Sequence, residues 1–318
     1  MNINYNNYLI SIVIPVYNGE KSIRELVQEL IIKLTPNYKI EIILVNDCSP
    51  DNSEDVCISL FNKYSDIVKF YSLAKNVGEH NAVMAGLNNI SGDFAVIIDD
   101  DFQNPINEID KLISYAIKNS YDVVYTYYDK KYHSFFRNLG SLFNDKIANS
   151  MLKKPNNLYL SSFKILNKFI VNEITKYDRP FPYVDGLILR TTSNIGKIKV
   201  EHSKRMVGKS SYTVSKLISL WLNMFTNFSI LPLRISIMFG FIFSFIGFLI
   251  GILTLVEKIL NPFMPIGYAS LIVAISMFSG IQLIAIGMVG EYMGRVYLSQ
   301  NKRPQFTIRK KFEKPLNN

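Results

Sequence analysis

Apolar runs and helix-spaced segments alternate over the first hundred residues of the chain. Four apolar runs predict buried strands, at residues 9–16, 40–47, 67–73 and 93–99. The segments between them have apolar residues at three- and four-residue intervals, and predict helices over 22–34, near 53–63 and over 78–90. Strands that alternate with helices in this way favour a parallel, doubly wound sheet that is covered on both faces.

Polar or turn-forming residues stand where each predicted strand ends. These strand ends are Pro15–Tyr17, Asn46–Asp47, Ala74–Asn76 and Asp99–Asp101. Ligands of such sheets bind beyond the carboxyl ends of the strands, so the four ends are expected to meet in one crevice. No G-x-G-x-x-G sequence follows the first strand, and the dinucleotide-binding fingerprint is therefore missing.

The pattern is less regular after residue 120. Residues 121–128 predict a strand, and residues 134–152 predict a helix with Arg137 and Ser141 on one face. Residues 212–230 have amphipathic helical spacing, and Trp221 would anchor such a helix in a membrane interface. An ordinary core helix is the alternative for this segment.

Two long uncharged segments near the C-terminus change the class of protein that is expected. Residues 235–256 and 261–290 carry no charged side chain, and a helix that spans a bilayer needs about 20 apolar residues. Two transmembrane helices are therefore predicted, with a pair of buried core helices as the alternative. Lys and Arg flank the two segments on their outer sides, whereas the loop between them has only Lys258. This asymmetry predicts cytoplasmic termini and an external loop.

Charge and cysteine content limit the kinds of binding partner that are expected. The 318 residues carry a formal net charge of +9, and the basic flanks of the apolar segments suit anionic lipid head groups. No basic stripe with interleaved aromatic residues is found in the remaining sequence, so a nucleic-acid partner is not expected. Cys48 and Cys57 have no metal-ligand spacing and are expected to be reduced.

Three consecutive aspartates, Asp99, Asp100 and Asp101, follow a buried strand. Carboxylates grouped in this way suit a hard divalent cation such as Mg²⁺, which takes one or two protein carboxylates and completes its shell with substrate phosphates. A solvated turn is the alternative. Asp47 can accept the imide N–H of uracil or cap the next helix, and Tyr17 can stack on a base or simply pack.

Six motifs occur in order along the chain: SIVIPVYN, ILVNDCSPDNS, NVGEHNAVMAGL, IIDDDFQNP, RMVGKSSY and GEYMGRVYLSQNKRP. Over roughly residues 9–304 the chain resembles the polyprenyl-phosphate glycosyltransferases, inverting enzymes of the GT-A fold. They include dolichol-phosphate mannose synthase, bacterial undecaprenyl-phosphate glucosyltransferases and undecaprenyl-phosphate formamidoarabinose transferase. The resemblance implies an α/β fold, with a Rossmann-like, mostly parallel sheet and a C-terminal two-helix transmembrane region.

The resemblance also implies an organisation and a location. The expected parts are a cytoplasmic GT-A domain over 1–208, an interfacial helix over 209–232, two transmembrane helices over 233–291 and a basic cytoplasmic tail over 292–318. The location implied is the bacterial inner membrane. A homo-oligomer is expected, and the similarity to the bacterial glucosyltransferases suggests a tetramer.

Site residues follow from the resemblance position by position. It places Pro15, Tyr17, Glu20 and Asp47 around the nucleotide, with Asp99 on the ribose side. It gives Asp101 and Gln103 as ligands of Mg²⁺ or Mn²⁺. The residues expected to face the acceptor phosphate are Arg137, Ser141, Arg205, Lys209 and Ser210. The four residues expected to carry catalysis are Asp99, Asp101, Arg137 and Arg205.

The chain departs from the family pattern in four places. Gly19 stands where many members have Glu, Asp100 where Ala is common and Lys209 where many have Glu. Ser161 and Ser162 occupy a region where several members place an acid, which puts a carboxylate base there in doubt. A phosphate acceptor makes such a base less necessary, because its second pKa is about 6 and the oxygen is already ionised near neutral pH.

The expected function is transfer of a sugar from a nucleotide sugar, with UDP as the expected nucleotide, to undecaprenyl phosphate. A processive polysaccharide synthase would need more spans and a Q-x-x-R-W motif, whereas Trp221 lies in SLWLN. A non-catalytic sugar-nucleotide-binding or lipid-translocator subunit is the alternative from another class. Glucose, an N-acetylhexosamine and a modified aminosugar all remain open as the sugar.

Overall fold

The computed structural model describes most of the N-terminal two thirds of the chain and parts of the remainder. The described residues are 7–102, 104–128, 155, 158–180, 182–201, 237–242, 245–246, 249, 252–253, 256, 259–260, 267–300 and 304–314. The chain divides into two compact units. Unit 1 comprises residues 1–212 and 302–318, and unit 2 comprises residues 213–301.

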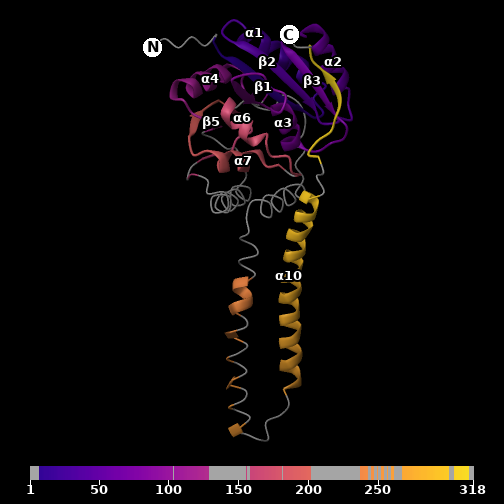
Figure 1. Cartoon of the computed structure of the whole chain (residues 1–318), viewed down its shortest axis with the longest axis vertical. Coiled ribbons are helices and arrows are strands. Elements are labelled where there is room, and N and C mark those ends of the chain that lie inside the picture. The colour runs from indigo at the N-terminus through magenta and orange to yellow at the C-terminus, as the bar shows by residue number, and fades with distance from the viewer. Residues whose placement is uncertain are drawn as a thin grey trace. The chain divides into compact units, whose positions relative to one another are not determined.

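Unit 1 is built around a sheet that has eight strands among the described residues (Figure 1). The strands are β1 (Leu9–Val16), β2 (Lys39–Asn46), β3 (Val68–Leu73), β4 (Phe94–Ile97), β5 (Val123–Tyr127), β6 (Lys164–Asn167), β7 (Ile195–Lys199) and β8 (Ile308–Phe312). Their order is β7-β5-β6-β4-β1-β2-β3-β8. Strands β4, β1, β2 and β3 are parallel neighbours, and β5 is parallel to β7. Strand β6 runs antiparallel to β4 and β5, and β8 runs antiparallel to β3.

Helices cover both faces of this sheet. The helices of unit 1 are α1 (Ile23–Leu34), α2 (Ser53–Lys63), α3 (Glu79–Leu87), α4 (Asn107–Asn119), α6 (Lys168–Ile174) and α7 (Val184–Thr191). Buried residues of α1, α2 and α4 pack with one face of the sheet, and those of α3, α6 and α7 pack with the other. Strand β1 alternates accordingly, since Ile12 and Ile14 join the first core and Val13 joins the second. The predicted α/β fold with a mostly parallel sheet is confirmed.

The strands and helices predicted over the first hundred residues agree with the structure to within a few residues. Strand β1 has the predicted bounds, and α1 begins one residue later than predicted. Helix α4 was not predicted, although Ile109, Leu112, Ile113 and Ala116 are buried at helical spacing. The helices predicted over 134–152 and 212–230 lie outside the described residues.

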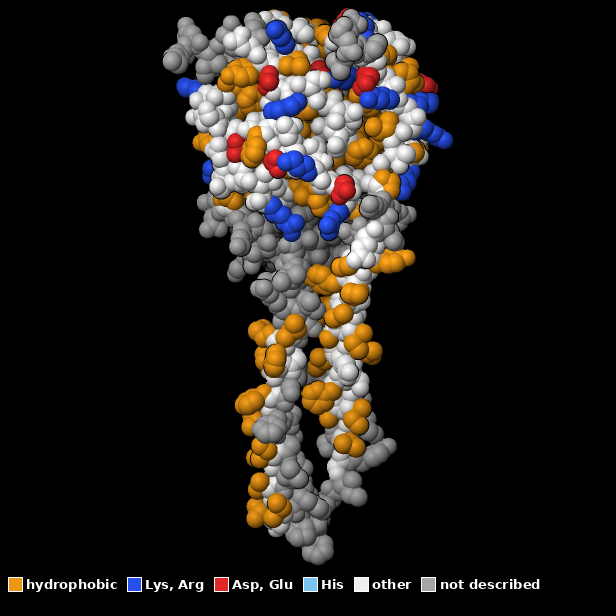
Figure 2. Space-filling view, in the orientation of Figure 1, with side chains coloured by type: hydrophobic (Ala, Val, Ile, Leu, Met, Phe, Trp, Pro, Cys, Tyr) orange, Lys and Arg blue, Asp and Glu red, His pale blue; other side chains and the backbone are white. Residues whose placement is uncertain are grey.

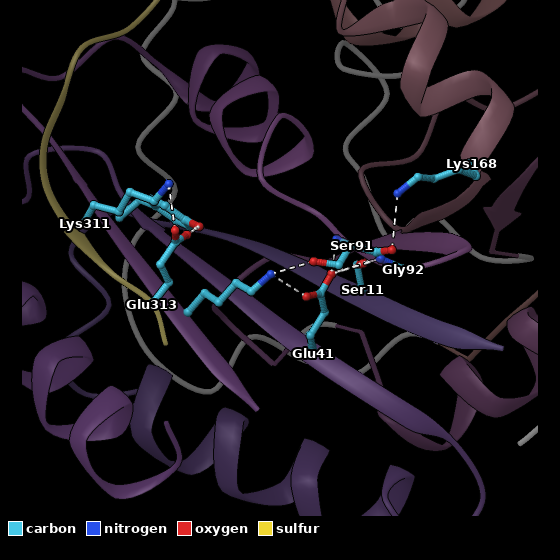
Figure 3. A network of polar contacts seen from close by, with 9 residues as sticks. Ser11, Glu41, Ser91, Gly92, Lys168, Lys311 and Glu313 are labelled. Carbon is cyan, nitrogen blue, oxygen red and sulfur yellow. Dashed lines mark hydrogen bonds and ion pairs between the residues drawn. The ribbon is translucent and has the colours of Figure 1, made fainter. Parts of the chain in front are cut away.

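A buried carboxylate, Glu41 of β2, ties the amino-terminal ends of three parallel strands together (Figure 3). Its Oε1 accepts hydrogen bonds from Ser11 Oγ at 2.5 Å and from the backbone N–H groups of Ser91 and Gly92 at 2.5 and 3.1 Å. Burial raises the pKa of Glu41, but the bonds from Lys69, Ser11 and Ser91 outweigh it and lower the pKa. Gly92 has no room for a side chain, because a Cβ atom would lie 2.4 Å from Ser11 Oγ. This network fixes β4 against β1 and β2 at the edge away from the predicted site.

Unit 2 contains the helix α10 (Tyr268–Gln300) and short described helical pieces between 237 and 260. Hydrophobic side chains are exposed along both parts (Figure 2). Within the described residues, no helix combines the length and the apolar character that crossing a membrane requires. The two predicted transmembrane helices therefore stay a prediction.

Residues 292–318, expected to form a basic tail, contain the end of α10 and the strand β8. Strand β8 returns to unit 1 and pairs with β3, with Phe312 stacked on Phe70 at a ring-centroid distance of 5.6 Å. The segment is thus an edge strand of the sheet over Ile308–Phe312.

Candidate functional site

Three loops that follow β1, β2 and β4 meet at the carboxyl edge of the sheet. The backbone N–H of Asp47 donates to the carbonyl of Val16 at 2.9 Å. The backbone N–H of Tyr17 donates to Asp100 Oδ2 at 3.3 Å. Tyr17, Asp47 and the three aspartates therefore share one edge, as the strand ends predicted.

Each of these loops contains a non-glycine residue with a left-handed backbone. Asn18, Cys48 and Phe102 have φ angles of 58°, 52° and 61°, and they directly follow Tyr17, Asp47 and Asp101. A left-handed conformation costs an L-residue about 1–2 kcal/mol. Strain of this kind gathers at functional sites, where the surrounding structure holds it in place. The three loops thus have shapes that local stability alone does not favour.

Asp47 is buried, with 3% of its surface exposed, and both of its carboxylate oxygens are bonded. Oδ1 accepts from the backbone N–H of Val77 at 2.8 Å, and Oδ2 accepts from Gly78 at 2.9 Å. Burial raises the pKa of Asp47, and the two backbone bonds oppose the rise without cancelling it. A carboxylate offers about four acceptor positions, so Asp47 can hold the loop before α3 and still accept from a base.

The alternative role of Asp47, as a cap of α2, is not observed. The N-cap residue of α2 is Asn52, and the side chain that accepts from the first turn is that of Asp51, bonded by the N–H of Ser53 at 3.2 Å. Glu20 joins the same loop, since its carboxylate accepts from Asn52 N and Nδ2 at 3.4 and 3.3 Å.

The other two residues expected around the nucleotide differ in exposure. Tyr17 is 43% exposed, which leaves its ring free to stack on a planar ligand. Pro15 is half-buried in β1, one residue before the strand ends. Glu20 and Asp47 therefore brace the loops, whereas Tyr17 offers an open ring beside them.

Asp99 receives a hydrogen bond from Ser162 Oγ at 2.6 Å. Burial, together with the negative charges of Glu79 and Asp101, raises the pKa of Asp99 to about 7, against the lowering effect of Ser162 and Lys164. In the sequence, Ser162 stands out only as a departure from the family pattern. The hydroxyl belongs to the site, and its contact joins residues that are 63 positions apart.

Asp101 is 9% exposed and lies two residues from Asp99. Its charge contributes to the raised pKa of Asp99, and a cation beside these carboxylates would relieve that repulsion. Within the described part of the chain, no group of three or more His, Cys, Asp or Glu side chains has the arrangement of a metal site. Mg²⁺ needs only one or two protein carboxylates when substrate phosphates complete its shell. The residues present therefore fit a divalent ion that arrives with a diphosphate.

Comparison with known proteins gives the family of the chain. Residues 11–175 match the model of glycosyl transferase family 2, which spans the three loops and Ser162. The chain belongs to glycosyl transferase family 2. The resemblance expected from the motifs is thereby confirmed, and the protein is a glycosyltransferase.

Two curated relatives of this family 2 glycosyltransferase match it over most of their length. The chain is 31% identical over 310 residues to the undecaprenyl-phosphate 4-deoxy-4-formamido-L-arabinose transferase of Photorhabdus laumondii, covering 95% of this chain and 93% of the relative. It is 32% identical over 308 residues to the enzyme of the same name from Proteus mirabilis, with the same coverage.

A solved structure supports the fold of the glycosyltransferase. The Mycobacterium tuberculosis glucosyl-3-phosphoglycerate synthase superposes with a TM-score of 0.50 at 17% identity, covering 68% of this chain and 77% of that one. At this identity the likeness concerns the fold alone, and it supports the GT-A architecture.

A buried ion pair behind Asp99 was not anticipated from the sequence. Lys164 of β6 bonds to Asp185 of α7, and Asp185 Oδ1 also accepts from Tyr125 OH at 2.8 Å. Both charged side chains are less than 10% exposed. A buried pair of this kind is stable only when its remaining polar groups are bonded, which Tyr125 provides. The pair joins α7 to β5 and β6.

The rest of the expected site lies outside the described residues. This group comprises Gln103, Arg137, Ser141, Arg205, Lys209 and Ser210. The residues expected on the donor side are thus described apart from Gln103, and those expected on the acceptor side are not.

Proposed function

We propose that this glycosyltransferase moves a sugar from a nucleotide sugar, with UDP as the nucleotide, to a polyprenyl phosphate such as undecaprenyl phosphate. The observation that carries the proposal is the similarity to undecaprenyl-phosphate transferases over 95% of the chain. It includes the C-terminal third, which the family model does not match. A likeness confined to the catalytic fold would leave the acceptor open, because one fold serves many acceptors.

The donor is held by the three loops at the carboxyl edge. Asp47 accepts the imide N–H of uracil while its backbone bonds to Val77 and Gly78 keep the carboxylate in place. Tyr17, with 43% of its surface exposed, stacks on the base. Asp99 lies on the ribose side, oriented by Ser162.

The reaction is a single displacement with inversion at the anomeric carbon. An oxygen of the lipid phosphate forms the new bond to that carbon as the bond to the nucleoside diphosphate breaks. The electron pair of the broken bond leaves with the diphosphate. The phosphate oxygen is already ionised, since the second pKa of a phosphate monoester is about 6. The enzyme therefore positions two anions, and no side chain has to remove a proton.

A divalent cation, Mg²⁺ or Mn²⁺, would be held by Asp101 and Gln103. When bound, the cation would neutralise charge on the leaving diphosphate. The position of Asp101 supports this role, because the side chain is 9% exposed and follows β4 by four residues.

The acceptor phosphate is gripped by Arg137, Ser141, Arg205, Lys209 and Ser210. Arginine side chains suit the task because they make two parallel hydrogen bonds to a phosphate. The isoprenoid tail stays in the membrane, where the two uncharged segments 235–256 and 261–290 hold the enzyme. The catalytic unit then lies at the cytoplasmic face of the bacterial inner membrane, and the product supplies assembly or modification of cell-envelope glycans.

The experiment follows release of UDP by the purified full chain. UDP-sugar alone, undecaprenyl phosphate alone and the two together are compared with and without Mg²⁺. The proposal expects release only when donor, lipid phosphate and metal are all present, and near-background release from the Asp101→Asn variant. Equal release without lipid phosphate would indicate a hydrolase and would contradict the proposal.

A further inference from the structure

Strand β8 reaches the donor loops through a chain of side chains that the reaction itself does not use. It lies at the sheet edge beside β3, where Ser72 is the register partner of Lys310. Phe312 packs on Phe70 and Phe61, and Glu313 accepts from Tyr71 OH at 2.6 Å. The strand is therefore docked firmly on unit 1 although it follows α10 in the sequence.

This series of side-chain contacts begins at Lys310, whose Nζ lies 2.5 Å from Glu54 Oε1. Glu54 stands in the first turn of α2. Its other oxygen, Oε2, accepts from Ser72 Oγ at 2.6 Å and from Asn46 Nδ2 at 3.4 Å. The hydrogen bond from Lys310, followed by that from Ser72, lowers the pKa of Glu54 and keeps the carboxylate ionised.

The series of contacts continues from Glu54 into the loops that follow β1 and β2. Asn46, the last residue of β2, is 1% exposed, and its Oδ1 accepts from Ser49 Oγ at 2.6 Å and from Ser49 N at 3.2 Å. Ser49 Oγ in turn accepts from the backbone N–H of Asn18 at 3.2 Å. Asn18 follows Tyr17, and Asn46 precedes Asp47. Four side chains thus connect β8 to the two residues proposed to hold the base.

This arrangement differs from an ordinary surface ion pair in the number of buried groups that share it. The side chain of Lys310 is 49% exposed, and an isolated exposed pair adds little to stability. Glu54, however, is shared with the buried polar side chains of Ser72 and Asn46, so the charge of Lys310 governs how three other groups are oriented. Its removal should act on loop geometry more than on folding.

We propose that Lys310 is a positioning residue for the nucleotide, through Glu54, Asn46 and Ser49. This inference rests on the proposed function, because it takes the loops after β1 and β2 as the base site. It makes donor affinity depend on a strand that lies beyond the uncharged segments in the sequence.

The test measures UDP affinity of the full chain in detergent by calorimetry. Lys310→Met is expected to weaken UDP binding about fivefold or more, the lower end of coupling between linked sites, and Lys310→Arg is expected to restore most of it. The donor KM should rise with little change in kcat or in the KM for lipid phosphate. Because Glu54 and Lys310 act through the same series of contacts, the losses of UDP affinity caused by Glu54→Gln and Lys310→Met should not be additive.

Lys311→Met is the matched control. Lys311 is the next residue of β8, is 50% exposed, and pairs with Glu313 at 2.9 Å (Figure 3), whereas Lys310 pairs with Glu54 of α2. Its loss should leave UDP affinity within about twofold, since surface changes away from a network have small effects.

Two results would overturn the inference while leaving the proposed function intact. One is wild-type affinity in Lys310→Met, and the other is an equal loss in Lys310→Met and Lys311→Met, which would mean that β8 only stabilises the sheet. Failure of the wild-type chain to bind UDP would instead overturn the proposed uridine site and, with it, this inference.

Discussion

Gly19 and Asp100 lie so close together that a Cβ atom on Gly19 would be 2.5 Å from Asp100 Oδ2. These are two of the positions at which the resemblance implied a departure from the family pattern. One departure removes a side chain, and the other places a carboxylate in the space that this side chain would enter. The same oxygen, Asp100 Oδ2, accepts a hydrogen bond from the backbone N–H of Tyr17 at 3.3 Å.

A methyl group at position 19 should therefore disturb the donor loop. Gly19→Ala is expected to push Asp100 away from Tyr17 N and to lower the free energy of unfolding by about 1–3 kcal/mol, as overpacking does. UDP affinity should fall with it. Chemical unfolding and calorimetry measure both effects.

The double variant tests the cause. In an Asp100→Ala background, Gly19→Ala should destabilise the protein much less, because the nearest clashing atom is gone. A residual contact remains, since Val16 Cγ1 would lie 3.0 Å from the new Cβ atom. If the double variant loses as much stability as the two single variants together, Asp100 is not the reason that position 19 needs a glycine.

Ser162 and Ser161 offer a matched pair for the role of the Asp99 contact. Ser162→Ala removes the 2.6 Å hydrogen bond to Asp99 and is expected to lower kcat/KM for the donor about 10-fold, the effect of about 1.4 kcal/mol. Ser161 instead bonds to Thr126 Oγ1 at 3.0 Å. Ser161→Ala should reduce stability without a comparable loss of activity, and the reverse pattern would exclude Ser162 from the site.

Loss of the proposed metal ligand, Asp101, has a distinct effect on activity and binding. Asp101→Asn is expected to keep the fold and to lose most turnover, and excess Mg²⁺ should restore little of it. UDP-sugar binding by the wild-type enzyme should weaken in EDTA, because the diphosphate would then face Asp99 and Asp101 without a counter-charge. Undiminished turnover in EDTA would refute the assignment of a metal to Asp101.

His80 predicts a specific dependence of stability on pH. The side chain packs edge-on against Tyr183 at a ring-centroid distance of 5.1 Å. Burial lowers its pKa from 6.5 to about 4, with Asp185 opposing the shift and Lys164 adding to it. Below pH 6.5 the unfolded chain binds a proton at His80, whereas the folded chain binds it only near pH 4. The contribution of neutral His80 is therefore complete above the unfolded pKa and is lost as the pH falls from 6.5 toward about 4.

The contribution of His80 to the pH dependence of the free energy of unfolding can be measured with His80→Phe, which keeps a ring against Tyr183. The free energy of unfolding of the wild type should fall more steeply between pH 6.5 and 4.5 than that of the variant, by up to about 1.4 kcal/mol per pH unit. Parallel curves for the two proteins would mean that the pKa of His80 is the same in the folded and the unfolded protein.

The predicted topology can be checked by chemical labelling in cells. A single cysteine at Asn261, in a chain without Cys48 and Cys57, should react with an impermeant maleimide added outside. A cysteine at Asn317 should react only after permeabilisation. Labelling at Asn317 from outside would place the catalytic unit on the wrong side of the membrane for a cytoplasmic donor.

The sequence was most informative where strands are buried on both faces. Strands β1 and β2 have no exposed face to interrupt the apolar run, so their bounds could be read almost to the residue. Strand β6 escaped notice because it has only four residues and begins with Lys164, a residue type that is rarely buried. Its partner Asp185 lies 21 positions further on, and no local pattern reports such a pair.

Charge hid the strand β8 in a similar way. Phe306, Ile308 and Phe312 lie among five basic residues between positions 302 and 311, which suggested a solvated tail. Only the antiparallel pairing with β3 shows where these apolar side chains pack.

The site was predictable as far as strand ends determine it. Tyr17, Asp47 and Asp99 could be placed at one edge because parallel strands share their carboxyl ends. The partners that hold them, namely Ser162 for Asp99 and the backbone of Val77 and Gly78 for Asp47, come from loops far away in the chain. Contacts of that kind depend on the complete fold, and no sequence spacing encodes them.

Mass spectrometry of the lipid product tests the central claim most directly. The purified enzyme is incubated with undecaprenyl phosphate, Mg²⁺ and, in turn, UDP-glucose, UDP-N-acetylglucosamine and UDP-4-deoxy-4-formamido-L-arabinose. The account predicts that one of these donors yields UDP and a lipid heavier than undecaprenyl phosphate by a single sugar residue, joined through one phosphate. A diphosphate-linked lipid released with UMP, or free sugar with unchanged lipid, would contradict it.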